Sequence, residues 1–232
     1  MKRLVLSAIL ILFIASVLFS QIHDSGNYPD TIRGEVWIEL EPIYGGVVDD
    51  DYPLDTRTAS LRALEESAML FSAMIYGWSF NYDVGERTRN IEEKFELTPV
   101  AKIPMSDPGL QVTEVEVKDM RIRMWADYHL TDVQQRQLGA WRTGNIKNAQ
   151  AIGYWNPGQS PNWLDVKKIA IEDAARAAVR AMLQSSERNR PKEVRGFISL
   201  ASFPNYYITA GRWAASARFR VEIIEIVPYT VY

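Results

Sequence analysis

Side chains suited to acid–base or nucleophilic chemistry are scarce in this 232-residue chain. It holds two histidines, His23 and His129, and no cysteine. A histidine that serves as a general base needs a second group to orient it, and neither ring has a recognisable partner nearby in the sequence. Motifs of serine hydrolases, phosphate-binding loops, dinucleotide-binding folds and zinc peptidases do not occur. We therefore expect a protein that is not an enzyme, with no catalytic residue, no cofactor and no metal site.

Acidic residues in pairs or runs are the next candidates, since two carboxylates can cleave a glycosidic bond and several can hold calcium. The groups are Glu65 with Glu66, Glu92 with Glu93, Glu114 with Glu116, and three aspartates at 49–51. We expect the first pair on the exposed side of a helix, the second in a charged linker and the third on a solvated strand face. The aspartate run lacks the ligand spacing of an EF-hand loop. Solvated charge therefore accounts for all four groups.

Aromatic and basic side chains offer surfaces for a partner. Seven tryptophans are scattered along the chain, and one of them falls on the acidic face of its predicted strand instead of the apolar face. Tryptophan is enriched at protein contacts. A basic group near residue 190 suits an anionic or acidic partner, although a solvated loop explains it equally well. The candidate contact residues are Trp37, Arg188, Arg190, Lys192 and Arg195.

The elements that must position these residues begin with a strand at 32–41, where apolar and polar residues alternate. Asp55 suits the N-cap of a helix over 56–76, and Gly77 suits its end. Extended segments follow at 78–84, 95–103 and 111–130. The last of these changes its alternation near residues 118–119, which predicts a bulge or bend.

The second half opens with a short helix over 133–141 and a strand over 149–155. Ser160 and Pro161 then form a strong helix start, with serine at the N-cap and proline at N1. The helix over 161–184 carries alanines along one face, which lets it lie close to a sheet. Further extended segments are expected at 194–202, 206–209 and 215–223.

These elements predict an α+β fold, with helices packed on mainly antiparallel sheets in two lobes of strand-helix-strand-strand type. A composition of 47% hydrophobic and 11% aromatic residues is sufficient for a buried core. The shared order of elements fits either a structural repeat or a chance arrangement. The expected domain plan is a signal peptide at 1–20, an exposed lead-in at 21–31, a first lobe at 32–130, a linker at 131–148 and a second lobe at 149–232.

The N-terminus carries the pattern of a secretion signal. Met1, Lys2 and Arg3 give a positive start, and the sixteen residues at 4–19 carry no charge. A membrane-spanning helix needs about 20 apolar residues, so the pattern favours a cleaved signal peptide over an uncleaved membrane anchor. Because the chain has no cysteine, we expect no lipoprotein. The expected location is the periplasm or another exported compartment.

Charge is unevenly spread along the chain. Nine acids and one base lie within 21–55, whereas eleven bases and four acids lie within 167–220. Such asymmetry suits association with an anionic surface or head-to-tail self-association, and packing of the two regions within one fold explains it as well. Export argues against nucleic acid as a partner.

The alanine-rich helix at 167–182 (KKIAIEDAARAAVRAM), the extended segments after it and a fainter echo at 57–74 resemble a known envelope pattern. The chain resembles, over part of its length, the N-terminal domain of the periplasmic flagellar assembly protein T and related secreted bacterial envelope proteins. The resemblance consists of helix periodicity and element order. It implies a non-enzymatic periplasmic protein that binds a large assembly such as the flagellar motor.

We therefore predict a secreted, non-catalytic protein of the bacterial envelope that acts by protein–protein contact, in a flagellar, motility or other envelope assembly. Its expected partner is an envelope protein such as a flagellar component, with self-association as a further option. The alternative function is a carbohydrate- or peptidoglycan-binding module that uses exposed tryptophans.

Overall fold

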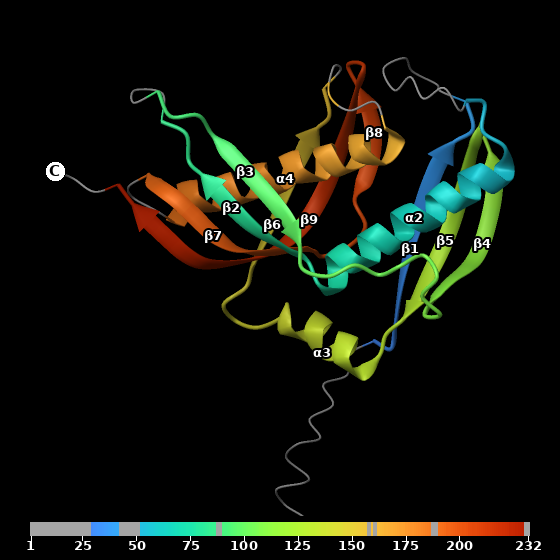
Figure 1. The fold of residues 1–232 in the computed structure, drawn as a ribbon, viewed down its shortest axis with the longest axis horizontal. Helices are drawn as coiled ribbons and strands as arrows, with labels where there is room; N and C mark the ends of the chain where they lie inside the picture. The colour runs from blue at the N-terminus through green and yellow to red at the C-terminus, as the bar shows by residue number, and fades with distance from the viewer. Residues whose placement is uncertain are drawn as a thin grey trace, which may run out of the picture.

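The computed structural model describes residues 29–41, 52–86, 90–156, 159, 162–186 and 190–229. Within these residues the chain forms three helices and nine strands, and every strand pairing is antiparallel (Figure 1). The predicted α+β class, with helices packed on antiparallel sheets, is confirmed. The predicted signal peptide at 1–20 lies outside the described residues. Among those described, no helix is long and apolar enough to cross a membrane.

The smaller sheet has three strands, in the order β1 (Thr31–Glu39), β5 (Arg121–His129) and β4 (Leu110–Lys118). Alternation along β1 places its apolar residues on one face, as the sequence predicts. Val36 is 2% exposed, and its partner on β5, Met124, is 1% exposed. This inner face of the sheet is therefore part of the core.

Residues 111–130 form a hairpin, so the predicted bulge or bend at 118–119 is wrong. Asp119 and Met120 both have positive φ, 51° and 56°, and Lys118 pairs with Arg121 across them. Two such residues between antiparallel strands match the type I′ turn. The reversal of the chain explains the change of alternation, and the bulge of this sheet lies instead between Val112 and Glu114.

The larger sheet has six strands. Five follow one path, in the order β3 (Lys94–Pro99), β2 (Trp78–Asp83), β7 (Pro191–Leu200), β9 (Arg212–Pro228) and β6 (Lys147–Tyr154). The sixth, β8 (Asn205–Thr209), pairs with β9 off this path. Because β2 pairs with β7, the sheet joins strands from both of the predicted lobes.

The first two helices both begin at a capping side chain, and the cap predicted for the first of them is confirmed. The Asp55 carboxylate accepts the backbone N–H of Thr58 at 2.7 Å and caps α2 (Thr56–Ile75). Gly77, just beyond its end, has a φ of 70°, a conformation that glycine adopts without penalty. Helix α3 (Asp132–Ala140) begins at a capping box formed by Thr131 and Gln134.

Helix α4 (Trp163–Ser186) begins later than predicted. Ser160 and Pro161, the predicted cap and first residue, lie outside the described residues. The Asn162 side-chain oxygen accepts the N–H groups of Leu164 and Asp165, at 3.0 and 3.3 Å. The predicted alanine face is buried only in part: Ala170 and Ala174 are buried, whereas Ala181 is exposed. At the buried part α4 lies close to β6, where a Cβ added to Gly153 would lie 2.0 Å from the backbone nitrogen of Ala174.

One apolar core extends across both sheets. Helix α2 packs on β1 and β5 of the smaller sheet and on β7 of the larger one, while α4 packs on β6 and β9. Phe71 of α2 shows the connection, with its ring centroid 5.6 Å from that of Tyr128 on β5 and 4.9 Å from that of Phe203 after β7. Helix α2 therefore links the two sheets.

Candidate functional site

Trp37, the tryptophan singled out by sequence, lies half-buried where the two sheets meet. Its ring stacks on Trp213 of β9, with centroids 5.3 Å apart and planes 23° apart. The Arg121 guanidinium carbon lies 4.2 Å from the centroid of the same ring. The aromatic surface of Trp37 is used within the molecule.

A buried ion pair lies beside this stack, and sequence reasoning missed it. The Lys167 ammonium of α4 bonds to the Glu66 carboxylate of α2, and the two side chains are 4% and 0% exposed. The same ammonium donates to the Trp37 carbonyl at 3.0 Å and lies 5.0 Å from the Tyr206 ring centroid. The expectation that Glu66 lies on the exposed side of its helix is wrong, because Glu66 is one of the buried residues of α2 and bonds to Lys167 of α4.

Burial shifts the pKa values of two acidic groups in this cluster. It raises the pKa of the Glu66 carboxyl, and the Lys167 charge works against that rise. Burial and the nearby Glu66 also raise the pKa of the Tyr206 hydroxyl well above its usual value. One Glu66 oxygen and the Tyr206 hydroxyl make no hydrogen bond within the described part of the chain. The arrangement joins α2, α4, β1 and β8.

A polar cavity of about 440 Å³ opens next to the Trp37 stack. Its charged lining comes from Glu35, Arg121 and Arg123, with Asn205 and Tyr206 from β8. Arg121 pairs with Glu39 at 3.5 Å and Arg123 pairs with Glu35 at 3.8 Å. The arginines of this cavity are therefore compensated by the protein's own carboxylates.

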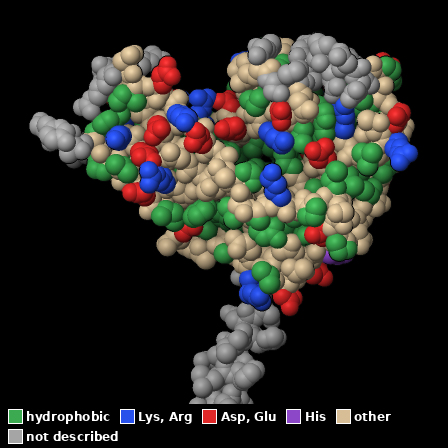
Figure 2. All heavy atoms as spheres, viewed as in Figure 1, with side chains coloured by type: hydrophobic (Ala, Val, Ile, Leu, Met, Phe, Trp, Pro, Cys, Tyr) green, Lys and Arg blue, Asp and Glu red, His purple; other side chains and the backbone are tan. Residues whose placement is uncertain are grey.

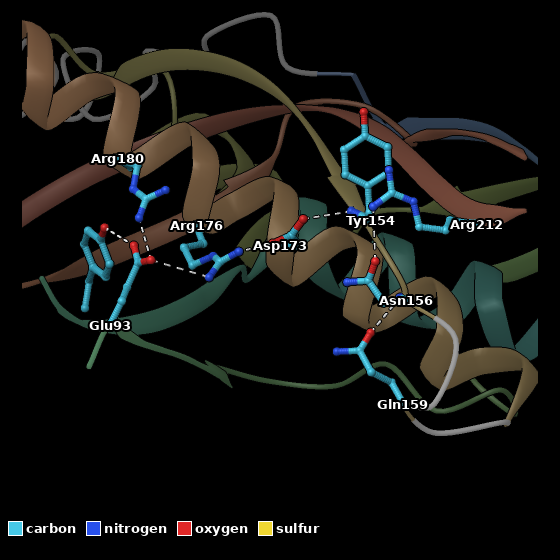
Figure 3. A network of polar contacts seen from close by, with 9 residues as sticks. Glu93, Tyr154, Asn156, Gln159, Asp173, Arg176, Arg180 and Arg212 are labelled. Atoms are coloured by element: carbon cyan, nitrogen blue, oxygen red, sulfur yellow. Dashed lines mark hydrogen bonds and ion pairs between the residues drawn. The ribbon is translucent and has the colours of Figure 1, made fainter. Parts of the chain in front are cut away.

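A second polar network holds α4 to the neighbouring strands (Figure 3). Tyr82 of β2 and Arg180 of α4 donate to the two oxygens of Glu93, each at 2.5 Å, and Arg176 lies 3.6 Å away. Glu93 therefore does not lie in a free charged linker. Arg176 also bonds to Asp173, which accepts the Tyr154 backbone N–H of β6 at 2.8 Å. Burial, and then donation to Glu93, raise the pKa of Tyr82.

An apolar groove of about 480 Å³ separates α2 from α4, next to β3. Figure 2 shows it as a hollow lined by hydrophobic side chains near the centre of this face. Met69, Trp78 and Ile171 are among its lining residues, and Lys102 and Glu172 are among the charged ones. Burial raises the pKa of Glu172. The groove has the size of a ligand pocket.

The outer strand of the smaller sheet leaves apolar side chains in solvent. Three valines of β4, which we call the valine stripe, are Val112, Val115 and Val117, at 45%, 49% and 57% exposed. Hydrophobic side chains gather at the right-hand edge of Figure 2, where Figure 1 places β4. The predicted carboxylates Glu114 and Glu116 alternate with the valines and are exposed, as expected of a solvated face. Glu114 lies 3.7 Å from Arg33 of β1.

The remaining candidate contact residues lie at the start of β7, on the opposite side of the molecule from β1 (Figure 1). Arg190 pairs with Glu86 at 3.7 Å, and Arg195 pairs with Glu193 and Glu225 at 2.5 and 3.3 Å. Lys192 is exposed, and Arg188 lies outside the described residues. The structure thus groups Arg190, Lys192 and Arg195 but separates them from Trp37.

The groups considered for catalysis or metal binding do not converge. His129 is exposed and its Nδ1 lies 3.0 Å from the Thr31 hydroxyl. His23 and the aspartates at 49–51 lie outside the described residues. Across the residues that the structure describes, no three His, Asp or Glu side chains gather to hold a metal ion. All seven tryptophans are described, and each is buried or half-buried.

Comparison with known proteins gives a family and a relative. A protein-family model matches residues 21–229 of the chain. An "Uncharacterized protein" of Treponema pallidum (strain Nichols) is 28% identical over 203 residues, which cover 87% of this chain and 83% of the relative. No solved structure matches the chain.

Proposed function

Because the chain belongs to the protein family whose model covers residues 21–229, we propose a function for that whole span: an exported, non-catalytic component of the bacterial envelope. In this proposal the protein acts by protein–protein contact within an envelope assembly such as the flagellar machinery. The family match begins where the predicted signal peptide ends, at residue 21, which supports export of the folded part.

The observation that carries the contact role is the valine stripe. Soluble proteins rarely leave a row of apolar side chains on an end strand uncovered, and such rows mark sites of association. The valine stripe lies on an element whose other face carries Glu114, Glu116 and Lys118, so the same strand offers both apolar and charged contacts. The carbohydrate-binding alternative depends on exposed tryptophans, and the structure half-buries or buries all seven.

Cross-linking in intact cells tests this function. The captured material is identified by mass spectrometry, and fractionation of the cells locates the protein. We expect recovery in the periplasmic or envelope fraction, with subunits of the flagellum or of another envelope machine attached. Capture of cell-wall fragments alone, or a cytoplasmic location, would overturn the proposal.

A further inference from the structure

We propose that the outer edge of β4 is a docking site for an extended segment of a partner protein in which apolar and basic residues alternate. This inference rests on the proposed function, because it specifies one surface and the chemistry of the partner for the same contact role. Three observations on β4 carry it: a free edge, an uncovered apolar face and two exposed glutamates, Glu114 and Glu116, on the opposite face.

The free edge follows from the order of the strands. β4 is the end strand of the smaller sheet and pairs with β5 and with no other described strand. An end strand leaves one row of backbone N–H and C=O groups unpaired. β4 is nine residues long, and its bulge lies near its start, between Val112 and Glu114. A partner strand added at this edge would pair the open backbone groups.

The apolar face shows which part of the sheet is uncovered. Val115 pairs with Met124 and Val117 pairs with Ile122 across the β4–β5 ladder, and paired residues share one face of a sheet. Met124 and Ile122 are 1% and 0% exposed, whereas the two valines are 49% and 57% exposed. Helix α2 packs on β1 and β5 and leaves the β4 side of the same face open. An added strand would place apolar side chains beside these valines.

Glu114 and Glu116, on the face opposite the valine stripe, set the charge of the partner, and Lys118 follows them at the end of the strand. Glu114 makes one long contact, 3.7 Å from Arg33, with both side chains half exposed or more. Glu116 is exposed and forms no ion pair within the described residues. Opposite charges on neighbouring strands stabilise a sheet, and like charges destabilise it. The residues that alternate with the apolar ones in the partner are therefore lysine or arginine.

In the antiparallel register centred on Val115, the charges of β4 disfavour a second copy of this chain as the occupant. Two β4 strands that pair antiparallel about Val115 set Glu114 of one copy against Glu116 of the other. This places two pairs of like charges in contact on one face of the joint sheet. A basic partner strand avoids that repulsion, which is why we assign the edge to a different protein.

Two synthetic peptides test the site on the protein purified from cells. Both are as long as β4; one alternates valine with lysine, and the control alternates valine with glutamate. Binding is measured by titration, and backbone amide exchange locates the bound peptide. We expect the lysine peptide to slow exchange along β4 and to bind roughly tenfold tighter than the glutamate peptide, because two opposite-charge pairs replace two like-charge pairs.

Charge reversal on β4 makes the test specific. Glu114→Lys with Glu116→Lys should switch the preference to the glutamate peptide. Glu92→Lys with Glu96→Lys changes the net charge equally on another exposed surface and should leave the preference unchanged. Thermal unfolding of both variants shows that each is folded.

Three results would overturn the site. They are an unchanged exchange along β4 with either peptide, equal affinity for both peptides, and a preference that survives charge reversal on β4. Protection of β4 by a concentration-dependent dimer, seen by sedimentation, would assign the edge to a second copy and equally overturn it. If the β4 charge-reversal variant still captures envelope subunits in cells, the proposed function stands while this docking site falls.

Discussion

At the scale of single residues, the Glu66–Lys167 pair shows how the fold tolerates two buried charges. Moving a carboxylate and an ammonium out of water costs several kcal/mol each, about what their attraction and hydrogen bonds return. Lys167 gains a further acceptor in the Trp37 carbonyl at 3.0 Å. Its aromatic neighbours also favour a cation. The pair therefore fixes the relative position of α2 and α4 more than it adds net stability.

Removing the cation should destabilise the protein in a pH-dependent way. Lys167→Met leaves a buried Glu66 carboxylate alone, and we expect a loss of about 3–5 kcal/mol in the free energy of unfolding at pH 7. Burial raises the Glu66 pKa above its ordinary 4.5, so folding favours the protonated form. That stability is present below pH 4.5 and is lost as pH rises through the folded pKa. The loss caused by the variant should therefore shrink in acid.

Denaturant titrations at pH 4.5 and pH 7 measure this difference. Lys168→Met is a matched control, because the Lys168 side chain is 49% exposed and pairs with Asp165 at 3.5 Å in the same helix turn. It should change stability by less than about 0.5 kcal/mol. The double variant Glu66→Met with Lys167→Met should recover most of the loss. An equal loss at both pH values would show that a lone carboxylate is not the cause.

Trp37 should behave as a packing residue. Trp37→Ala removes the stack on Trp213 and the contact with Arg121, so we expect a loss of about 2–3 kcal/mol in the free energy of unfolding, below that of a fully buried tryptophan. Chemical denaturation measures it. A variant of unchanged stability that loses its cross-linked partner would instead make Trp37 a contact residue.

Local residue roles were predictable from sequence, and distant ones were not. The Asp55 cap depends on Thr58, three residues away, so the pattern contains both partners. Glu66 and Lys167 are 101 residues apart, and each alone looks like an ordinary surface charge. A signal was present in the position of Glu66, three residues after Ala63 and four before Leu70, which are both buried. A charge on an apolar helix face indicates a buried partner elsewhere.

At the scale of elements, the β4–β5 turn stores a local strain. Asp119 and Met120 adopt positive φ, which costs an ordinary L-residue roughly 1–2 kcal/mol. Met120→Gly should therefore stabilise the protein by about 0.5 kcal/mol, after allowing for the greater freedom of glycine in the unfolded chain. Lys118→Gly, in the adjoining strand, should instead destabilise it by about 0.5–1 kcal/mol. Thermal unfolding of the two variants measures both changes, and a Met120→Gly variant that is less stable would contradict this account.

The same turn explains why the hairpin was missed. Type I′ turns are recognised in sequences by asparagine or aspartate followed by glycine, and here methionine takes the glycine position. Periodicity located the strands and helices well, because it reflects which face is buried. Periodicity could not distinguish one bent strand over residues 111–130 from two strands paired as a hairpin. The start of α4 was also predicted at the wrong residue. Ser160–Pro161 and Asn162 are both good helix starts, and the sequence alone does not decide between them.

At the scale of the whole molecule, the shared core predicts one cooperative unfolding transition. Ile122 of the smaller sheet and Ile198 of the larger sheet are both fully buried in it. Replacing either by alanine should cost about 3 kcal/mol and shift one common transition, seen alike by tryptophan fluorescence and circular dichroism. Two separable transitions, with Ile122→Ala affecting one of them, would mean that the sheets unfold independently.

The assignment of strands to sheets was beyond sequence reasoning. Each segment of the chain shows its own alternation, but nothing in β2 identifies β7 as its neighbour. The two-lobe plan groups segments that are close in sequence, whereas β2 and β3 extend a sheet built mainly from the second half. Long-range pairing depends on how well whole faces pack together.

Because β2 pairs with β7, the larger sheet can be completed only after β7 has been synthesised. During synthesis, β2 and β3 leave the ribosome long before β7. Until β7 emerges, the edge of β2 that later pairs with β7 is unpaired in the nascent chain. The length of this interval depends on how far apart β2 and β7 lie in the sequence, and not on the stability of the folded protein. Any factor that shields the growing chain has to act within that interval. In a rearranged gene that places residues 191–229 ahead of residue 29, β7 is synthesised before β2. This variant should aggregate less during expression.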